Sequence, residues 1–219
     1  MNFITHSFRH ADVILREPEF IEQYTELLSV ISNISDDDIK RKHKSYGETN
    51  VLSTPKSLSK AINDLLKERL GELEWNCESR IFQNPDYTGD TWRLDFAKKD
   101  ISIEVAFNHS TVIAWNLIKP ALASELNHVQ KAIQTKIGVI ITATNNMKVA
   151  GGFDSAIGTY EKFLDYLPPL QNMLTTPLLI IGLTPPNTFK IIQSSPELRK
   201  TIGSIEDLHD EFRQDTLSH

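Results

Sequence analysis

Two acidic residues, Asp95 and Glu104, lie on two short strand-like runs that Lys98-Lys99-Asp100 joins, which predicts a β-hairpin. The runs are Trp92–Ala97 and Ile101–Phe107, and in the second Ile101, Ile103, Val105 and Phe107 alternate with Ser102, Glu104 and Ala106. A period of two sends alternate side chains to opposite faces. With Lys98-Lys99 as the turn, Asp95 lies opposite Ser102, and Glu104 lies opposite Arg93. The two carboxylates are then diagonal neighbours with Cβ atoms about 7–8 Å apart or less.

Such a carboxylate pair has the chemistry of a metal site. Two anions that point into one small volume repel each other unless a cation lies between them. The hairpin contains no Cys or His, and hard oxygen ligands favour magnesium over zinc. The alternative interpretation is that Asp95 and Glu104 are solvated residues on the outer face of a surface hairpin.

The composition is that of an ordinary soluble globular protein with a formal net charge of -6. The sequence contains no apolar run long enough for a membrane span and no apolar N-terminal run like that of a signal peptide, which predicts a cytoplasmic protein. The single Cys77 excludes an internal disulfide and a Cys-based zinc site. The negative total argues against nucleic acid as a partner, although the distribution of charge matters more.

Basic residues are concentrated in residues 40–69, which predicts a basic loop-helix segment at about 40–70. The positive residues are Lys40, Arg41, Lys42, Lys44, Lys56, Lys60, Lys67 and Arg69, a local excess of five charges over Glu48, Asp64 and Glu68. Such a segment either contacts phosphates or is simply solvated. Residues 33–53 are predicted to form a loop, and Thr54-Pro55 is predicted to begin a helix that ends near Leu70.

The remaining elements alternate between strands and helices. Helices are predicted at about 10–32 with a break at Glu17-Pro18, at about 111–134 with a kink at Pro120, and at about 155–172; strands are predicted at 78–83, Ile137–Ala143 and Leu178–Leu183. The last two strands are continuous apolar runs of the kind found in the middle of a sheet. We therefore expect an α/β fold with a mixed central β-sheet flanked by helices, in a single domain over 1–219 with a polar C-terminal tail from about 200.

The hairpin also has a family resemblance. The stretch Leu94–Phe107 (LDFAKKDISIEVAF) resembles the active-site hairpin of the PD-(D/E)xK nuclease superfamily and, more narrowly, that of the BglII/BstYI group of type II restriction endonucleases. In that group the hairpin reads Asp-Phe, a basic turn, then Glu-Val-Gln-Phe. Weaker similarities keep the same order along the chain, namely His10-Ala11-Asp12-x-Ile14-Leu15, Gly138–Thr142, Tyr160-Glu161 and the strand LLIIGL. The resemblance covers residues of about 8–185 and implies a restriction-endonuclease-like core.

The resemblance implies roles for the hairpin residues. Asp95 and Glu104 bind the catalytic Mg²⁺, and Val105 adds its backbone carbonyl. The third position of the motif, which is Lys in much of the superfamily and Gln in this group, is Ala106 here, and alanine can neither orient a water nor donate to a phosphate. Three explanations remain open: another side chain supplies the function, the metal alone suffices, or the protein binds DNA without cutting it. The candidate substitutes are Lys119, Asn108 and Arg93.

The resemblance also implies DNA contacts. Glu78 lies where the family has an auxiliary residue at the metal, and its alternative is a surface Glu on a strand edge. Asn108, His109 and Ser110 are expected to face the bases in the major groove, as are Asp154 and Ser155, and Lys119 is expected to contact DNA. The alternative for Asn108 and Ser110 is a cap on the next helix, and Asp154 or Ser155 has the same alternative at the helix that follows.

These expectations together describe a type II restriction endonuclease with a Mg²⁺ cofactor. It is expected to cut double-stranded DNA at a short palindrome, for which the resemblance suggests a GATC core, and to leave 5′ phosphates. Because one site cuts one strand, symmetric cleavage predicts a homodimer, with an interface through Ile113, Trp115, Leu117 and Ile118. The alternatives are a cleavage-deficient DNA-binding or regulatory relative on the same fold, and a less specific defence or repair nuclease.

Overall fold

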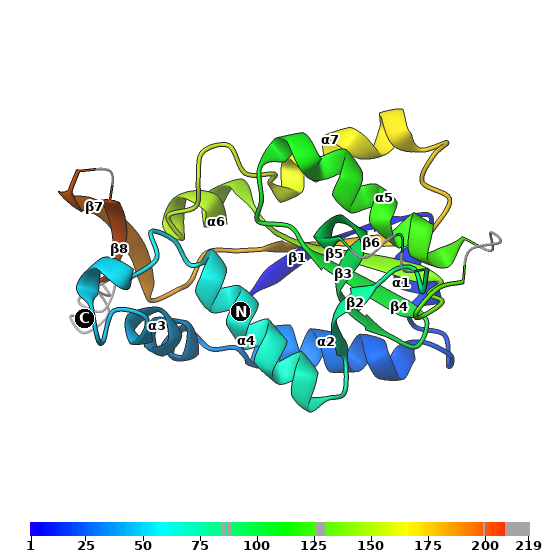
Figure 1. The fold of residues 1–219 in the computed structure, drawn as a ribbon, viewed down its shortest axis with the longest axis horizontal. Helices are drawn as coiled ribbons and strands as arrows, with labels where there is room; N and C mark the ends of the chain where they lie inside the picture. The colour runs from blue at the N-terminus through cyan, green and yellow to red at the C-terminus, as the bar shows by residue number, and fades with distance from the viewer. Residues whose placement is uncertain (85, 87–88, 126–129, 199, 209–219) are drawn as a thin grey trace, which may run out of the picture.

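A six-stranded mixed sheet runs through the centre of the computed structural model, which describes residues 1–84, 86, 89–125, 130–198 and 200–208 (Figure 1). The strands are β1 (Phe3–Phe8), β2 (Asn76–Arg80), β3 (Arg93–Lys98), β4 (Ile101–Val105), β5 (Ile137–Ala143) and β6 (Leu178–Leu183). Their order is β1-β6-β5-β4-β3-β2, with β4, β5 and β6 parallel and every other pairing antiparallel. The predicted mixed sheet is confirmed.

Helices cover both faces of the sheet, so that it is seen edge-on between two helical layers in Figure 1. The helices are α1 (Ala11–Ile14), α2 (Ile21–Asn33), α3 (Asp36–Ser45), α4 (Ser59–Glu72), α5 (Ile113–Ser124), α6 (Asn145–Ala150) and α7 (Tyr160–Leu170), and 3₁₀ turns occur at Val51–Ser53, Asp90–Trp92 and Ser110–Val112. Apolar residues of α2 and α4 pack with Ile103 and Val139 on one face. Those of α5 and α7 pack with Ile140 and Ile180 on the other. None of the helices in the described ranges combines the length and apolar character that crossing a membrane requires.

The two central strands have the bounds predicted from their apolar runs. Every residue of β5 and of β6 is buried, because helices cover both faces of the sheet at these strands. The break at Glu17-Pro18 is also confirmed, since α1 ends at Ile14 and α2 begins at Ile21.

The hairpin has the predicted strands but a different register. Lys98 pairs with Ile101, Ala97 with Ser102 and Phe96 with Ile103. The turn residues are therefore Lys99 and Asp100, and Lys99 takes a left-handed backbone conformation with φ of 48°. The prediction that Asp95 lies opposite Ser102 was wrong by two residues.

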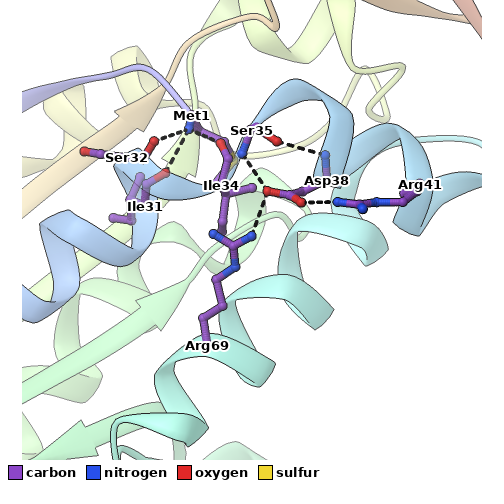
Figure 2. A network of polar contacts seen from close by, with 8 residues as sticks. All are labelled: Met1, Ile31, Ser32, Ile34, Ser35, Asp38, Arg41 and Arg69. Atoms are coloured by element: carbon purple, nitrogen blue, oxygen red, sulfur yellow. Dashed lines mark hydrogen bonds and ion pairs between the residues drawn. The ribbon is translucent and has the colours of Figure 1, made fainter.

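A helix, α3, occupies residues 36–45 of the loop predicted for residues 33–53. Ser35 begins it with a capping box, in which its hydroxyl accepts from the backbone N–H of Asp38 and the Asp38 carboxylate accepts from that of Ser35 (Figure 2). Arg41 of the same helix and Arg69 of α4 also contact the Asp38 carboxylate, and the Arg69 contact ties α3 to α4. The ammonium group of Met1 donates to the carbonyls of Ile31, Ser32 and Ile34 at the end of α2. The segment was predicted to be a loop because it is rich in charged residues. It forms a helix that a capping box and ion pairs stabilise.

Other boundaries also differ from the predictions. α4 begins at Ser59 rather than at Thr54-Pro55, α5 ends at Ser124, and α7 begins at Tyr160. Residues 126–129 of the predicted helix lie outside the described residues. Ile113 and Leu117, which were predicted to form a dimer interface, are buried in the core of this chain between α5 and the sheet.

A two-stranded arm follows the sheet where a polar tail was predicted from about residue 200. Its strands, β7 (Phe189–Glu197) and β8 (Lys200–Asp207), pair with each other and lie at one end of the molecule in Figure 1. The tail prediction was wrong over 200–207, because these residues form a strand that pairs with β7 and buries Ile202 and Gly203. The remainder of the predicted tail, residues 209–219, lies outside the described residues.

Candidate active site at the β3–β4 hairpin

Asp95 and Glu104 come together at the open end of the hairpin, beyond the pair Phe96–Ile103. Continuing that register by one pair places the two acids directly opposite each other, closer than the predicted diagonal arrangement. The Asp95 carboxylate also accepts a hydrogen bond of 2.6 Å from the backbone N–H of Val105. The hairpin thus holds both carboxylates at one place in the sheet.

Glu104 is buried, with only 2% of its surface exposed. Burial raises the pKa of its carboxyl to about 8; the charge of Asp95 adds to the rise, and the ammonium group of Lys119 opposes it. Burial likewise raises the pKa of Asp95, against the stabilising N–H of Val105. Within the described residues, Oε1 of Glu104 is buried and has no hydrogen-bond partner. The interpretation of Glu104 as a solvated surface residue is therefore wrong.

Lys119 reaches Glu104 from α5. Its Nζ forms an ion pair with Oε2 of Glu104 and donates to the backbone carbonyl of Arg93 at 3.1 Å, and its side chain is 11% exposed. Of the three candidate substitutes for the missing motif side chain, Lys119 is the one with an ion pair to Glu104 among the described contacts. Arg93 lies instead opposite Arg80 of β2, with its guanidinium 3.6 Å from Glu78.

A cavity of about 190 Å³ opens beside Asp95 on the side of α4. Asn63, Asp64 and Lys67 of α4, Glu78 of β2 and the hairpin residues Asp95 and Val105 line it. The sequence analysis did not single out Asn63 and Lys67 as site residues. The signal that was available is their spacing of four residues, which puts two polar side chains on one helical face.

Glu78 shares this cavity but is engaged elsewhere. Its carboxylate lies 2.6 Å from Lys67 and 3.6 Å from Arg93, and its backbone is left-handed with φ of 51°. It lies at the level of Asp95 on the neighbouring strand, between the pairs Cys77–Phe96 and Ser79–Leu94. Its charge raises the pKa of Asp95, so it is close enough to act on the site.

The donor set of the hairpin fits a hard divalent cation. The two carboxylates and the Val105 carbonyl that follows them are all oxygen donors, and Oε1 of Glu104 is a buried acceptor without a partner. No three His, Cys, Asp or Glu side chains gather as a metal cluster in the ranges that the structure describes. Magnesium does not require such a cage, because it is commonly bound by one or two carboxylates with waters and substrate phosphates completing its shell.

The two segments expected to contact DNA bases lie next to each other beyond the end of β4. His109 and Ile157 form an isolated antiparallel β-bridge. The backbone N–H of Gly158 donates to the carbonyl of Asn108, and the backbone N–H of Ser110 donates to the carbonyl of Ala156. The side chains of Asn108, His109, Asp154 and Ser155 are exposed, and that of Ser110 is half-buried.

Helix capping does not account for most of these residues. The N-cap of α5 is Val112, so neither Asn108 nor Ser110 caps that helix. The N-cap of α7 is Thr159, so neither Asp154 nor Ser155 caps that one. His109 caps the short 3₁₀ turn at Ser110–Val112. Asp154 instead accepts from Lys56 at 2.9 Å and from the backbone N–H of Ala156 at 3.0 Å, and the Lys56 contact lowers its pKa.

The basic segment, residues 40–69, has less unpaired positive charge than its composition suggested. Among the described residues, its ion pairs are Lys40–Asp37, Lys40–Asp207, Arg41–Asp38, Lys42–Glu68, Lys56–Asp154, Lys67–Glu78 and Arg69–Asp38. Most of its excess positive charge is therefore offset by acids from other parts of the chain.

Comparisons with known proteins agree with this architecture. The model of the family described as restriction endonuclease BglII/BglIII matches residues 3–183. The crystal structure of restriction endonuclease BglII complexed with a DNA 16-mer is similar over 95% of this chain and 100% of that one, with 18% identity and a TM-score of 0.63. The crystal structure of free BglII is also similar over 95% of this chain and 100% of that one, with 18% identity and a TM-score of 0.51. At this identity the two structures support the fold, and no curated protein sequence matches the chain.

Proposed function

Because the chain belongs to the restriction endonuclease BglII/BglIII family, we propose that it cuts double-stranded DNA at a short palindromic site in a magnesium-dependent reaction. Family membership makes it a type II site-specific deoxyribonuclease. The observation that carries the finer proposal is the pair of carboxylates of the buried Glu104 and the half-buried Asp95, with Oε1 of Glu104 left without a hydrogen-bond partner in the described structure.

In the proposed reaction, water attacks phosphorus, the bond from phosphorus to the 3′ oxygen breaks, and the product keeps a 5′ phosphate. Asp95 and Glu104 would hold the metal with their carboxylates, and Val105 with its backbone carbonyl. Magnesium bound there would supply the positive charge that stabilises the phosphate and the leaving oxygen. The N–H of Val105 fixes the Asp95 carboxylate, so its orientation is set before any substrate arrives.

The segments at 108–110 and 154–158 are the proposed sequence readers. They lie side by side past the end of β4 and present amide, imidazole, carboxylate and hydroxyl groups to solvent. Asn suits the edge of adenine, and Asp accepts from cytosine. The similar BglII structure contains a DNA 16-mer, which supports double-stranded DNA as the substrate. We propose a recognition site with a GATC core.

A homodimer follows from the symmetry of the proposed target, since two sites are needed to cut both strands of a palindrome. The interface must use residues other than Ile113 and Leu117, because both are buried in the core of the chain. A cytoplasmic restriction–modification pair with a DNA methyltransferase is the setting we propose, because an unprotected genome would be cut.

Incubation of the purified protein with long duplex DNA and Mg²⁺ tests the proposal. Discrete fragments whose ends map to one short palindrome and carry 5′ phosphates are expected. A sequence-dependent gel shift without cleavage would instead identify a DNA-binding protein, the alternative that Ala106 favours. A smear of fragments would identify a less specific nuclease.

A further inference from the structure

We propose that Lys119 is a catalytic residue: α5 places its ammonium group beside Glu104, where the residue at position 106, an alanine, has no polar side chain. This inference rests on the proposed function. It assigns to Lys119 a contact with the attacking water and with the phosphate, in addition to the ion pair with Glu104.

The first argument is the shared face. Glu104 and Ala106 are two residues apart on the chain, so their side chains point to the same side of the sheet. Ala106 packs with Ile113 and Leu117 of α5, which shows that this side lies under α5. Lys119 comes from the same helix and contacts Glu104. Its ammonium group is thus on the side from which a Lys or Gln at position 106 would act.

The second argument is that the alanine and the lysine belong to one arrangement. Ala106 is 2% exposed, and a longer side chain there would displace Ile113 or Leu117. On β5, Gly138 lies opposite Ser102 of β4, and its lack of a side chain leaves room for the ring of Pro120, the residue next to Lys119. Small residues at 106 and 138 therefore let α5 lie close to the sheet, and this close approach brings Lys119 to Glu104.

The third argument concerns energetics. A buried ion pair commonly contributes little net stability, because desolvation of both charges offsets their attraction. Lys119 leaves Oε1 of Glu104 without a partner, so it does not complete the hydrogen bonding of that carboxylate. A costly and incomplete pair beside the proposed metal ligands is better explained by a role in the reaction than by a role in folding.

The other cationic and amide groups near the hairpin are engaged elsewhere. Arg93 and Lys67 both lie against Glu78, on the side of the cavity. Asn108 accepts a hydrogen bond of 3.1 Å from Asn116 and is exposed beyond the end of β4.

In the proposed step Lys119 keeps its proton. Its N–H groups hold the attacking water in line and donate to a non-bridging oxygen of the phosphate, where negative charge increases as the new O–P bond forms. The water loses one proton to solvent, the bond to the 3′ oxygen breaks, and that oxygen gains one proton from solvent. Lys119 is unchanged at the end of the reaction.

Two variants separate this role from a structural one. Lys119→Met keeps the length of the side chain without its charge, and we expect single-turnover cleavage of long duplex DNA in Mg²⁺ to fall by about 100-fold or more. The matched control is Lys98→Met, which removes another largely buried ion pair, with Glu26, from the turn end of the same hairpin. It should cleave at the wild-type rate even if it is less stable.

Calorimetric titration with Ca²⁺ supplies a readout that does not depend on cleavage. Loss of a neighbouring positive charge should leave Lys119→Met binding Ca²⁺ at least as tightly as the wild type. Cleavage by Lys119→Met within about threefold of the wild type would overturn the proposal, since removal of a general acid–base or orienting group costs far more. Loss of cleavage together with loss of Ca²⁺ binding would also overturn it, because Lys119 would then merely hold Glu104 in place.

If Lys119→Met does not fold, Lys119→Gln replaces it, because its amide still donates to Glu104. Reduced cleavage with retained Ca²⁺ binding supports the proposal, and a wild-type rate overturns it. A wild-type protein that neither cuts DNA nor binds Ca²⁺ would instead contradict the proposed function, so the two failures are distinguishable.

Discussion

Pro120 of α5 packs directly onto Gly138 of β5, so closely that a Cβ atom on the glycine would lie 2.4 Å from the Cβ of the proline. The same Cβ would lie 2.6 Å from a methyl group of Leu178. Real Cβ atoms do not approach other carbons so closely, and the proline ring cannot turn aside as a flexible side chain would. The distance between α5 and the sheet is therefore set at this contact.

Gly138→Ala is expected to push α5 away from the sheet and to move Lys119 from Glu104. Overpacking of this kind lowers the free energy of unfolding by about 1–3 kcal/mol. Single-turnover cleavage should fall as well, by more than the loss of folded protein explains. Urea denaturation and cleavage assays on the same samples measure the two effects. Gly89→Ala is the matched control, because a Cβ there meets no atom within 4 Å.

Asp95→Ala is expected to abolish cleavage and to leave DNA binding measurable. The substitution removes one of the two proposed carboxylate ligands and the acceptor for the N–H of Val105. Fragment analysis and gel shift on one DNA measure the two properties separately. Asp100→Ala, which removes an aspartate at the turn of the same hairpin, should cut normally. Cleavage by Asp95→Ala at the wild-type rate would show that the metal site is wrongly assigned.

The metal-free protein is expected to lose stability as pH rises from about 4.5 to about 8. Glu104 has a pKa near 4.5 when unfolded and of about 8 in the fold, so within this window the folded state holds a proton that the unfolded state has released. The free energy of unfolding then decreases with pH, whereas below the window both states are protonated. Denaturation in a chelator at several pH values measures this slope. Glu104→Gln should remove the part of this pH dependence that the Glu104 carboxyl causes. If the slope in the variant equals that of the wild type, Glu104 is not the group responsible.

The same carboxyl predicts a pH dependence for cation binding. A divalent cation must displace the proton that Glu104 keeps, so its affinity increases as the pH rises toward and past about 8. The rise in Tm caused by a fixed Ca²⁺ concentration should therefore be larger at pH 8.5 than at pH 6. An equal rise at both values would mean that the cation binds away from Glu104.

Sequence patterns predicted the parts of this fold that depend on local periodicity. Continuous apolar runs predicted β5 and β6 to the residue, because only strands buried on both faces need them. Alternation in Ile101–Phe107 placed Glu104 and Ala106 on one face. The hairpin register could not be predicted, since it depends on the left-handed conformation that Lys99 adopts in the turn.

The parts that were missed depend on contacts between distant residues. β1 pairs with β6, which lies far along the chain, and α3 is held by the cap at Ser35 and by ion pairs rather than by an apolar face. The contact from Lys119 to Glu104 was one of three alternatives in the sequence. Only the packing of α5 on the sheet distinguishes it from the others.

Asp38→Ala is expected to lower the free energy of unfolding by about 2 kcal/mol at pH 7, because it removes a capping acceptor and a charged partner of Arg69. The hydrogen bond from the backbone of Ser35 is the main cause that lowers the pKa of Asp38 to about 2 (Figure 2). The stabilisation of the fold by the Asp38 carboxylate is therefore fully present above the unfolded pKa of 3.8 and is lost as the pH falls through about 2. The difference between wild type and variant, measured by urea denaturation, should shrink accordingly.

The matched control for that effect is Asp37→Ala. Asp37 is 87% exposed and its ion pair with Lys40 spans 3.7 Å, so its removal should cost less than about 0.5 kcal/mol. An equal loss in both variants would mean that the net charge of the first helical turn, and not the capping geometry of Asp38, stabilises α3.

Asn108→Ala is expected to weaken binding to the cognate duplex by about 1–3 kcal/mol and to leave binding to an unrelated duplex unchanged. The carboxamide oxygen of Asn108 accepts from Asn116, which is buried, so the side chain is held before DNA arrives. A base contact acts only at the correct sequence, whereas phosphate contacts act at every sequence. Titrations of both duplexes in Ca²⁺, with the cognate site taken from the mapped cleavage ends, measure the difference. Equal losses on both duplexes would assign Asn108 to the phosphates instead.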